Sequence, residues 1–127
     1  MARYLSDAWI AEVHDALAAD AGVREAATGD RLVVEQRVDD AVYHLSIDER
    51  SVAVRRGPAA EADVCFAQDR STAVAIARGE RSIHDAFMAG ALRVSGDVGV
   101  LAGRQPLFRA IDGALDEVRA RTDYGRG

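Results

Sequence analysis

Hydrophobic residues near the start of the chain recur with the period of a helix. Between residues 6 and 22 the large apolar side chains lie on one helical face, at Trp9, Ile10, Val13 and Leu17. Ser6 or Asp7 can cap the start of this helix, and we expect Gly22 to end it. We expect a polar connection over residues 24–30, after which the hydrophobic period changes from about 3.6 residues to two.

Three strands are predicted next, over residues 31–38, 41–48 and 51–57. Apolar residues alternate with polar ones in each segment, as in a strand with one buried face. The apolar face of the first strand is interrupted by Gln36. The two connections are too short for a parallel crossover, which needs about a dozen residues, so the three strands form antiparallel hairpins. The residues that share a face are Leu32, Val34 and Val38, then Ala41, Tyr43, Leu45 and Ile47, then Val52 and Val54.

Two more strands and several helices are predicted for the second half of the chain. We expect one helix to start after Asp69 or Ser71 and to stop at Gly79. A second, short helix starts at a Ser82 capping signal and stops at Gly90. We expect the last six residues, TDYGRG, to be frayed. The predicted ranges are strands 63–68 and 91–95 and helices 69–79, 82–90, 97–103 and 106–121, the last opened by Pro106.

Length and composition are typical of one globular domain, which we place at residues 1–127. The chain has 127 residues, of which 49% are hydrophobic and 29% charged, enough to form one hydrophobic core. Its net charge is -5, and this negative field opposes nucleic acids, so we expect no nucleic-acid partner. All basic residues are arginine, which suggests a bacterial protein from a GC-rich genome.

Cysteine usage and the N-terminal residues favour a cytoplasmic protein. The single Cys65 cannot form an internal disulfide, and its apolar neighbours favour a buried, reduced thiol. The start of the chain lacks the basic and apolar regions of a signal peptide. No run approaches the ~20 apolar residues of a spanning helix, so no integral membrane segment is expected.

Gly96 and Gly99, which flank Asp97, raise the question of a phosphate-binding loop. The P-loop pattern requires a lysine, which this chain lacks, and the dinucleotide pattern requires glycines at a different spacing. These glycines are better explained as turn and helix-end residues.

Catalytic and metal-binding patterns are also weak. His14, His44 and His84 are 30 and 40 residues apart, unlike the short spacings of metal sites, although a spatial cluster stays open. Cys65 has no basic neighbour that would lower its pKa. We therefore expect no catalytic residue, no metal and no cofactor, and an enzyme that uses His84 is the least favoured hypothesis.

Large apolar side chains are abundant in the second half of the chain, where short elements meet at glycines. They could form ordinary core, or they could line a cavity for an apolar ligand. The candidate ligand-binding residues are Phe66, Ile76, Phe87, Met88, Leu92, Val94, Val98, Leu101, Phe108 and Ile111.

Residues 62–101 carry a specific set of features. These are the Ala62–Asp63 strand start, Gly79 at a helix end, Phe87 before Gly90, and the glycine, leucine and aspartate of the segment GALRVSGD, residues 90–97. In their order and spacing these features resemble the sterol carrier protein 2 (SCP2) family of sterol- and lipid-binding domains. With the preceding hairpins the likeness covers about residues 28–115. Arg93 and Ala91 stand where family members often have lysine.

The resemblance implies a fold of the α/β class, of the α+β type, with a five-stranded, mostly antiparallel sheet covered by helices and an apolar tunnel between them. It also implies noncatalytic binding or transfer of a sterol, fatty acid or fatty acyl-CoA. On this hypothesis Gly90 breaks a short helix so that Phe87 and Met88 turn inward beside Leu92 and Val94. The alternative is an accessory module with a collapsed cavity, like related domains appended to bacterial enzymes, whose partner is a second copy or an enzyme.

Overall fold

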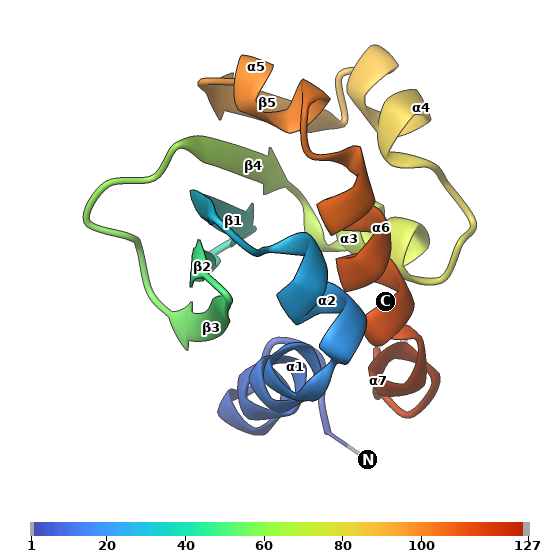
Figure 1. Cartoon of the computed structure of the whole chain (residues 1–127). Helices are drawn as coiled ribbons and strands as arrows, with labels where there is room; N and C mark the ends of the chain where they lie inside the picture. Colours follow the sequence, from blue (N-terminus) through green and yellow to red (C-terminus); the bar gives the residue numbers. More distant parts are fainter. Residues whose placement is uncertain (1, 126–127) are drawn as a thin grey trace.

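The structure, a computed structural model, describes residues 2–125. Within these residues the chain forms a five-stranded sheet and seven helices (Figure 1). The strands are β1 (Asp30–Val38), β2 (Ala41–Glu49), β3 (Ser51–Arg56), β4 (Val64–Gln68) and β5 (Leu92–Gly96). The helices are α1 (Asp7–Ala19), α2 (Ala21–Ala26), α3 (Arg70–Ala77), α4 (Ile83–Met88), α5 (Gly99–Ala102), α6 (Gln105–Ala114) and α7 (Asp116–Ala120).

The sheet is mixed, with the strand order β3-β2-β1-β4-β5. The first three strands form the predicted antiparallel hairpins, and β5 runs antiparallel to β4. Only β1 and β4 are parallel, because the connection over residues 57–63 carries the chain from one edge of the hairpins to the far side of β1. The prediction of a five-stranded, mostly antiparallel sheet with helices is confirmed.

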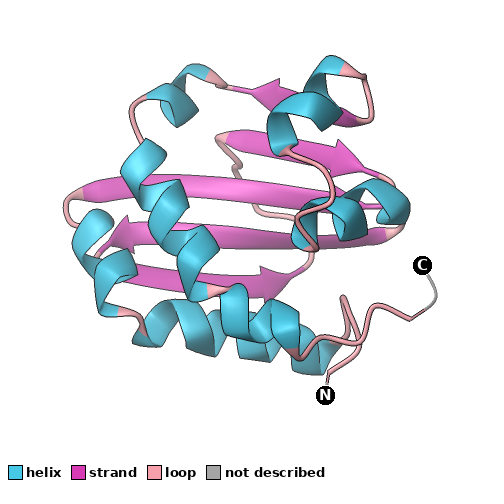
Figure 2. Ribbon diagram, turned by 90° about the vertical axis from the view of Figure 1, so that its right-hand side faces the viewer, coloured by secondary structure: helices cyan, strands magenta, loops and turns pink. Residues whose placement is uncertain are grey.

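The helices lie on one side of the sheet, and the connection 57–63 lies on the other (Figure 1). α1 runs beside the β3 edge, α4 and α5 lie near the β5 edge, and α6 lies between them. Figure 2 shows the helices in front of the strands, so that the main core forms between the two layers. Trp9, Ile10, Val13 and Leu17 of α1 are all buried there, as their helical spacing predicted.

The N-terminal helix is shorter than predicted, and a second helix, α2, takes up the end of the predicted helix and the first residues of the predicted polar connection. The side chain of Asp20 accepts a hydrogen bond from the backbone N–H of Val23 at 2.9 Å and so caps α2. Gly22 therefore lies inside α2 and does not end α1. The new helix forms because its cap is locally satisfied and because Val23 becomes fully buried.

The C-terminal region also differs from prediction. The expected helix over residues 106–121 is divided into α6 and α7, which meet at Leu115. Residues 122–125 are not frayed, because Tyr124 is buried against Tyr4 with ring centroids 5.2 Å apart. Arg70 donates a hydrogen bond to the Tyr124 carbonyl oxygen at 2.8 Å. The last two residues of the predicted frayed tail lie outside the described residues.

Candidate functional site

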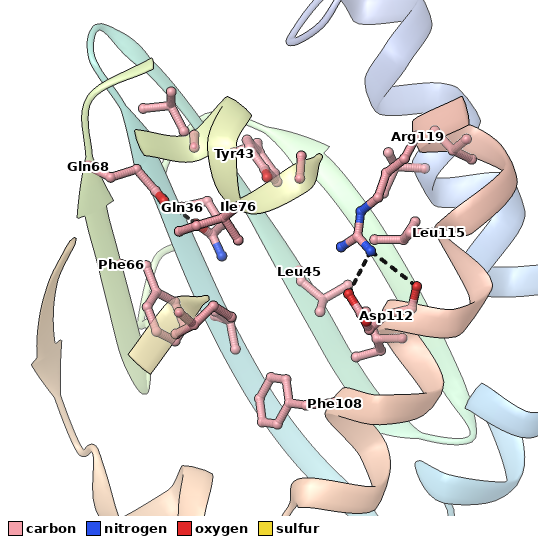
Figure 3. Close-up of a pocket in the computed structure, with 18 of the residues that line it drawn as sticks. Gln36, Tyr43, Leu45, Phe66, Gln68, Ile76, Phe108, Asp112, Leu115 and Arg119 are labelled. Atoms are coloured by element: carbon pink, nitrogen blue, oxygen red, sulfur yellow. Dashed lines mark hydrogen bonds and ion pairs between the residues drawn. The ribbon is translucent and has the colours of Figure 1, made fainter. Parts of the chain in front are cut away.

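A cavity of about 640 Å³ lies between the sheet and the helices. This volume falls within the range of about 300–1,000 Å³ that is usual for small-molecule sites. Its floor is formed by β1, β2 and β4, and its walls by α1, α3, α6 and α7 (Figure 3). The labelled lining residues in the close-up are Gln36, Tyr43, Leu45, Phe66, Gln68, Ile76, Phe108, Asp112, Leu115 and Arg119.

The hollow arises because one large apolar residue of α6 is buried in the core, whereas the next one lines the cavity and does not fill it. α6 packs against α2, and Leu107 is fully buried in the core. The next residue, Phe108, lies over the sheet and stays only partly buried. Tyr43 and Leu45 on β2 are likewise only partly buried, although they face the helical layer. Their remaining accessible surface is the floor of the cavity.

The mouth of the cavity is marked by its exposed lining residues. Ser82 and Ile83 lie at the start of α4, whereas Gln105, Arg109 and Asp112 lie on the outer side of α6. A ligand would therefore enter between α6 and the connection from α3 to α4. The lining charges are those of Arg81, Arg109, Asp112 and Arg119.

Arg119 is already paired within the wall. Its guanidinium Nη1 lies 2.6 Å from Asp112 Oδ1 and also donates to the Asp112 carbonyl oxygen at 3.3 Å (Figure 3). By contrast, Arg81 and Arg109 have no ion pair among residues 2–125. The excess charge at the mouth is therefore positive.

Uncharged polar groups lie on the otherwise apolar floor. The Gln68 amide nitrogen donates to Gln36 Oε1 at 3.1 Å. Tyr43 stands directly opposite Gln36 in the β1–β2 register, and its ring meets that of Trp9 edge to face at 5.6 Å. Burial raises the pKa of Tyr43 far above its usual range, so this residue is a neutral phenol.

Five of the ten candidate residues line the cavity, and five do not. The five that line it are Phe66, Ile76, Leu92, Phe108 and Ile111. Val94 and Leu101 are partly buried outside the lining, and Phe87, Met88 and Val98 are 51%, 70% and 51% exposed. Contact with a ligand stays a prediction for all ten.

The expected inward turn of Phe87 and Met88 is wrong. Gly90 does end α4, with a φ of 77°. However, α4 is a short helix whose inward position is taken by Ala86, which is fully buried. The next two residues therefore follow the helical turn out to solvent. Gly96 acts as a close-packing glycine, since a Cβ there would lie 2.4 Å from the Asp63 carbonyl oxygen.

Sequence reasoning did not select the floor residues from the first two strands as ligand contacts. The alternation places Tyr43 and Leu45 correctly on one strand face, but it assigns them no contact with a ligand. The available signal was Gln36, a polar residue on an otherwise apolar strand face. Because buried polar groups almost always have hydrogen-bond partners, a glutamine on this face indicates a polar neighbour or solvent beside it.

Two of the three histidines have backbone hydrogen-bond partners, and the third is exposed. His14 Nδ1 accepts a hydrogen bond from the Val54 backbone at 3.0 Å, and His44 Nδ1 lies 2.9 Å from the Gly57 carbonyl oxygen. His84 is exposed on α4. Residues 2–125 hold no group of three or more side chains arranged to bind a metal.

Cys65 is partly buried on the face opposite the cavity, where its sulfur lies 3.6 Å from Glu35 Oε2. Burial, reinforced by this carboxylate, raises the pKa of the thiol. The group is thus held as a thiol, and it is less buried than the sequence led us to expect.

Comparison with known proteins agrees with this fold. Residues 13–109 match the model of the SCP-2 sterol transfer family, and the chain therefore belongs to that family. No curated protein matches the chain. In the described residues, no helix has both the length and the apolar character needed to cross a membrane.

Solved structures with the same fold share little sequence with this chain. A crystal structure of sterol carrier protein 2 superposes with a TM-score of 0.68 at 19% identity, covering 95% of this chain and 100% of that one. A conserved hypothetical protein from Thermus thermophilus gives 0.64 at 19% identity, covering 100% and 94%.

The fold also occurs within a longer protein. The inverting sec-alkylsulfatase Pisa1 from Pseudomonas sp. matches with a TM-score of 0.54 at 21% identity over 73% of this chain. This chain spans only 14% of the sulfatase.

Proposed function

We propose that this protein binds a lipid or another elongated apolar molecule in the cavity, without catalysis. The observation that carries the proposal is a hollow of about 640 Å³ with a largely apolar lining in a chain of the SCP-2 sterol transfer family. A hollow of this size is costly in a small domain, because its lining side chains lose their packing partners. A bound apolar molecule would restore those contacts.

Burial of the ligand supplies enough free energy. Each buried CH₂ group contributes about 0.8 kcal/mol, so a sixteen-carbon chain offers roughly 12 kcal/mol before the loss of ligand freedom is subtracted. Micromolar affinity therefore requires no covalent or metal anchor. For a ligand with an anionic head group, Arg81 and Arg109 at the mouth are the cations that can receive it.

Extraction under denaturing conditions followed by lipid mass spectrometry tests this proposal directly. We expect the purified protein to carry an apolar molecule in near-stoichiometric amount. Because the single Trp9 lines the cavity, its fluorescence should change when a stripped sample is titrated with dodecanoate or cholesterol. Failure of both ligands to bind at high micromolar concentration, together with an empty extract, would exclude lipid binding.

A second candidate function is that of an accessory module. It is favoured by the apolar side chains of Ile83, Phe87 and Met88, which are all more than half exposed on α4. On this proposal the chain self-associates or docks onto an enzyme through α4. Light scattering on the wild type and on Met88→Ser tests self-association, which the substitution should weaken. A wild type that stays monomeric at high concentration would exclude the self-associating form.

A further inference from the structure

We propose that the cavity selects apolar molecules that carry an uncharged hydrogen-bonding oxygen, which binds to Gln36 and Gln68 on its floor. This inference rests on the proposed function, since it names the chemical class of ligand for the same cavity. It assigns Gln36 and Gln68 as specificity-determining residues, with Tyr43 as a third contact.

The position of Gln36 makes its side chain a cavity group. Gln36 lies on β1, the central strand, with β2 on one side and β4 on the other. Its side chain is nevertheless only partly buried and lines the cavity. Solvent and ligands can therefore reach this amide only through the hollow, so its polar atoms need either water or a ligand group inside it.

Three neighbouring strands contribute to one polar row. Tyr43 on β2 stands directly opposite Gln36 on β1, and Phe66 on β4 stands opposite Gln36 on the other side. Gln68 lies two residues beyond Phe66, on the same face of β4, and reaches back to Gln36. The three polar side chains thus cross the floor side by side (Figure 3).

Protein partners use only part of the hydrogen-bonding capacity of this row, and water or a ligand must supply the rest. A bond between two amides uses one N–H donor and one carbonyl acceptor, so further donors and one carbonyl oxygen with no amide donor are left over. Within residues 2–125, the Tyr43 hydroxyl has no protein partner either. A hydroxyl, ketone or ester oxygen in the ligand can satisfy these groups, whereas a pure hydrocarbon leaves them unpaired.

The row is suited to a neutral oxygen and not to a carboxylate. Gln36, Gln68 and Tyr43 are uncharged, and the cation in the adjacent wall, Arg119, is already held by Asp112 at 2.6 Å. A buried carboxylate without a free cation would be strongly disfavoured. We therefore expect a charged head group to bind at the mouth of the cavity. The mouth and the polar row would then contact different parts of one ligand.

The test compares ligand pairs that differ by one hydroxyl. Dodecane and dodecanol, and cholestane and cholestanol, compete with bound Nile red on the wild type and on the double variant Gln36→Leu/Gln68→Leu. The ratio of alkane to alcohol affinity is compared between the two proteins, so that differences in ligand hydration cancel. We expect the double variant to shift this ratio toward the alkane by roughly tenfold, the value of about one hydrogen bond.

Controls separate the specific role from general damage. Gln105→Leu makes the same change at the exposed mouth and should leave the ratio unchanged, while Tyr43→Phe should give a smaller shift than the double variant. Dodecanoate should bind the double variant as well as it binds the wild type. The melting temperature of each variant verifies folding.

The outcomes distinguish the two proposals. If all ligands displace Nile red and the alkane-to-alcohol ratio changes less than twofold in the double variant, the polar row has no selective role, and lipid binding stands. If no ligand displaces Nile red from the wild type, lipid binding itself is excluded and this inference falls with it.

Discussion

Arg104 and Asp30, which are 74 residues apart in sequence, form a two-pronged ion pair between the start of α6 and the start of β1. Arg104 Nε lies 2.9 Å and 2.8 Å from the two carboxylate oxygens, and Nη2 lies 2.8 Å from Oδ1. Nη1 also donates to the Val100 carbonyl oxygen at 2.8 Å. The hydrogen bond to Asp30 raises the pKa of Arg104. The pair ties the α5–α6 connection to the sheet and so fixes the position of the helix over the cavity.

Replacement of Arg104 by lysine should therefore destabilise the protein although the charge is kept. A lysine cannot reproduce the planar fork that contacts both oxygens and the Val100 carbonyl. We expect a loss of about 1–2 kcal/mol in urea unfolding. Arg31→Lys is the matched control, because the Arg31–Asp48 pair is exposed and contributes little. Equal effects of the two substitutions would contradict the proposed role of the fork.

Glu35 should make stability depend on acid pH. Burial raises the pKa of Glu35, but hydrogen bonds from Arg37 and the Ala59 backbone N–H outweigh it, so the pKa lies below its usual value. A lowered folded-state pKa stabilises the protein above the unfolded-state pKa of about 4.3, and this stability is lost as pH falls. Glu35→Gln should lower stability at neutral pH by about 1–3 kcal/mol and should flatten the decline below pH of about 4.3.

The matched control for this prediction is Glu61→Gln, since Glu61 is exposed. Urea midpoints for the wild type and both variants across the acid range provide the measurement. If the urea midpoint of Glu35→Gln fell with decreasing pH as steeply as that of the wild type, this carboxylate would not be the cause of the stability loss in acid.

Three tyrosines with raised pKa values, Tyr4, Tyr43 and Tyr124, predict a loss of stability at high pH. Burial raises the pKa of Tyr4 to about 12, and Tyr43 and Tyr124 are shifted upward for the same reason. The folded state thus retains protons that the unfolded state releases, so stability is full below pH 10.0, the ordinary value, and falls between there and about 12. Urea unfolding with tyrosinate absorbance should show this decline.

The same decline should be shallower in Tyr4→Phe, because one of the three shifted groups is removed. Tyrosine titration at the ordinary pKa in the folded protein would contradict the burial of these phenols.

Filling the cavity should abolish ligand binding without unfolding the protein. Leu45 on β2 lies on the floor of the cavity, and its side chain borders the open space of the cavity. In Leu45→Trp the larger side chain enters that space, so we expect at least a tenfold loss of affinity for dodecanoate with unchanged or raised melting temperature. Val98→Trp, at an exposed position outside the lining, should bind normally. Tight binding by Leu45→Trp would place the ligand elsewhere.

Much of the fold could be predicted from local patterns. The alternation around Val34, Leu45 and Val54 gave the three hairpin strands within one or two residues of their observed ends. Strand periodicity depends only on neighbouring residues and on which face is buried. The second helix after Asp20 was missed, because its few residues are helical only where the cap and the burial of Val23 cooperate.

The candidate site was predictable only in part, because apolar character does not say which side of a short helix faces inward. Phe108 and Ile76 line the cavity, whereas Phe87 is exposed next to the buried Ala86. In a six-residue helix a single buried alanine fixes the orientation, and larger neighbours must then point outward.

By itself, the sequence determined the strands, the family and the helix caps at Ser6, Asp69 and Ser82, because these depend on residue spacing and on glycine, serine and aspartate at element ends. Only the tertiary structure decided that a hollow exists and that Gln36, Tyr43 and Gln68 meet on its floor. A cavity is the difference between the space that helices enclose and the volume that side chains fill. That difference depends on how the layers pack, which no local pattern records.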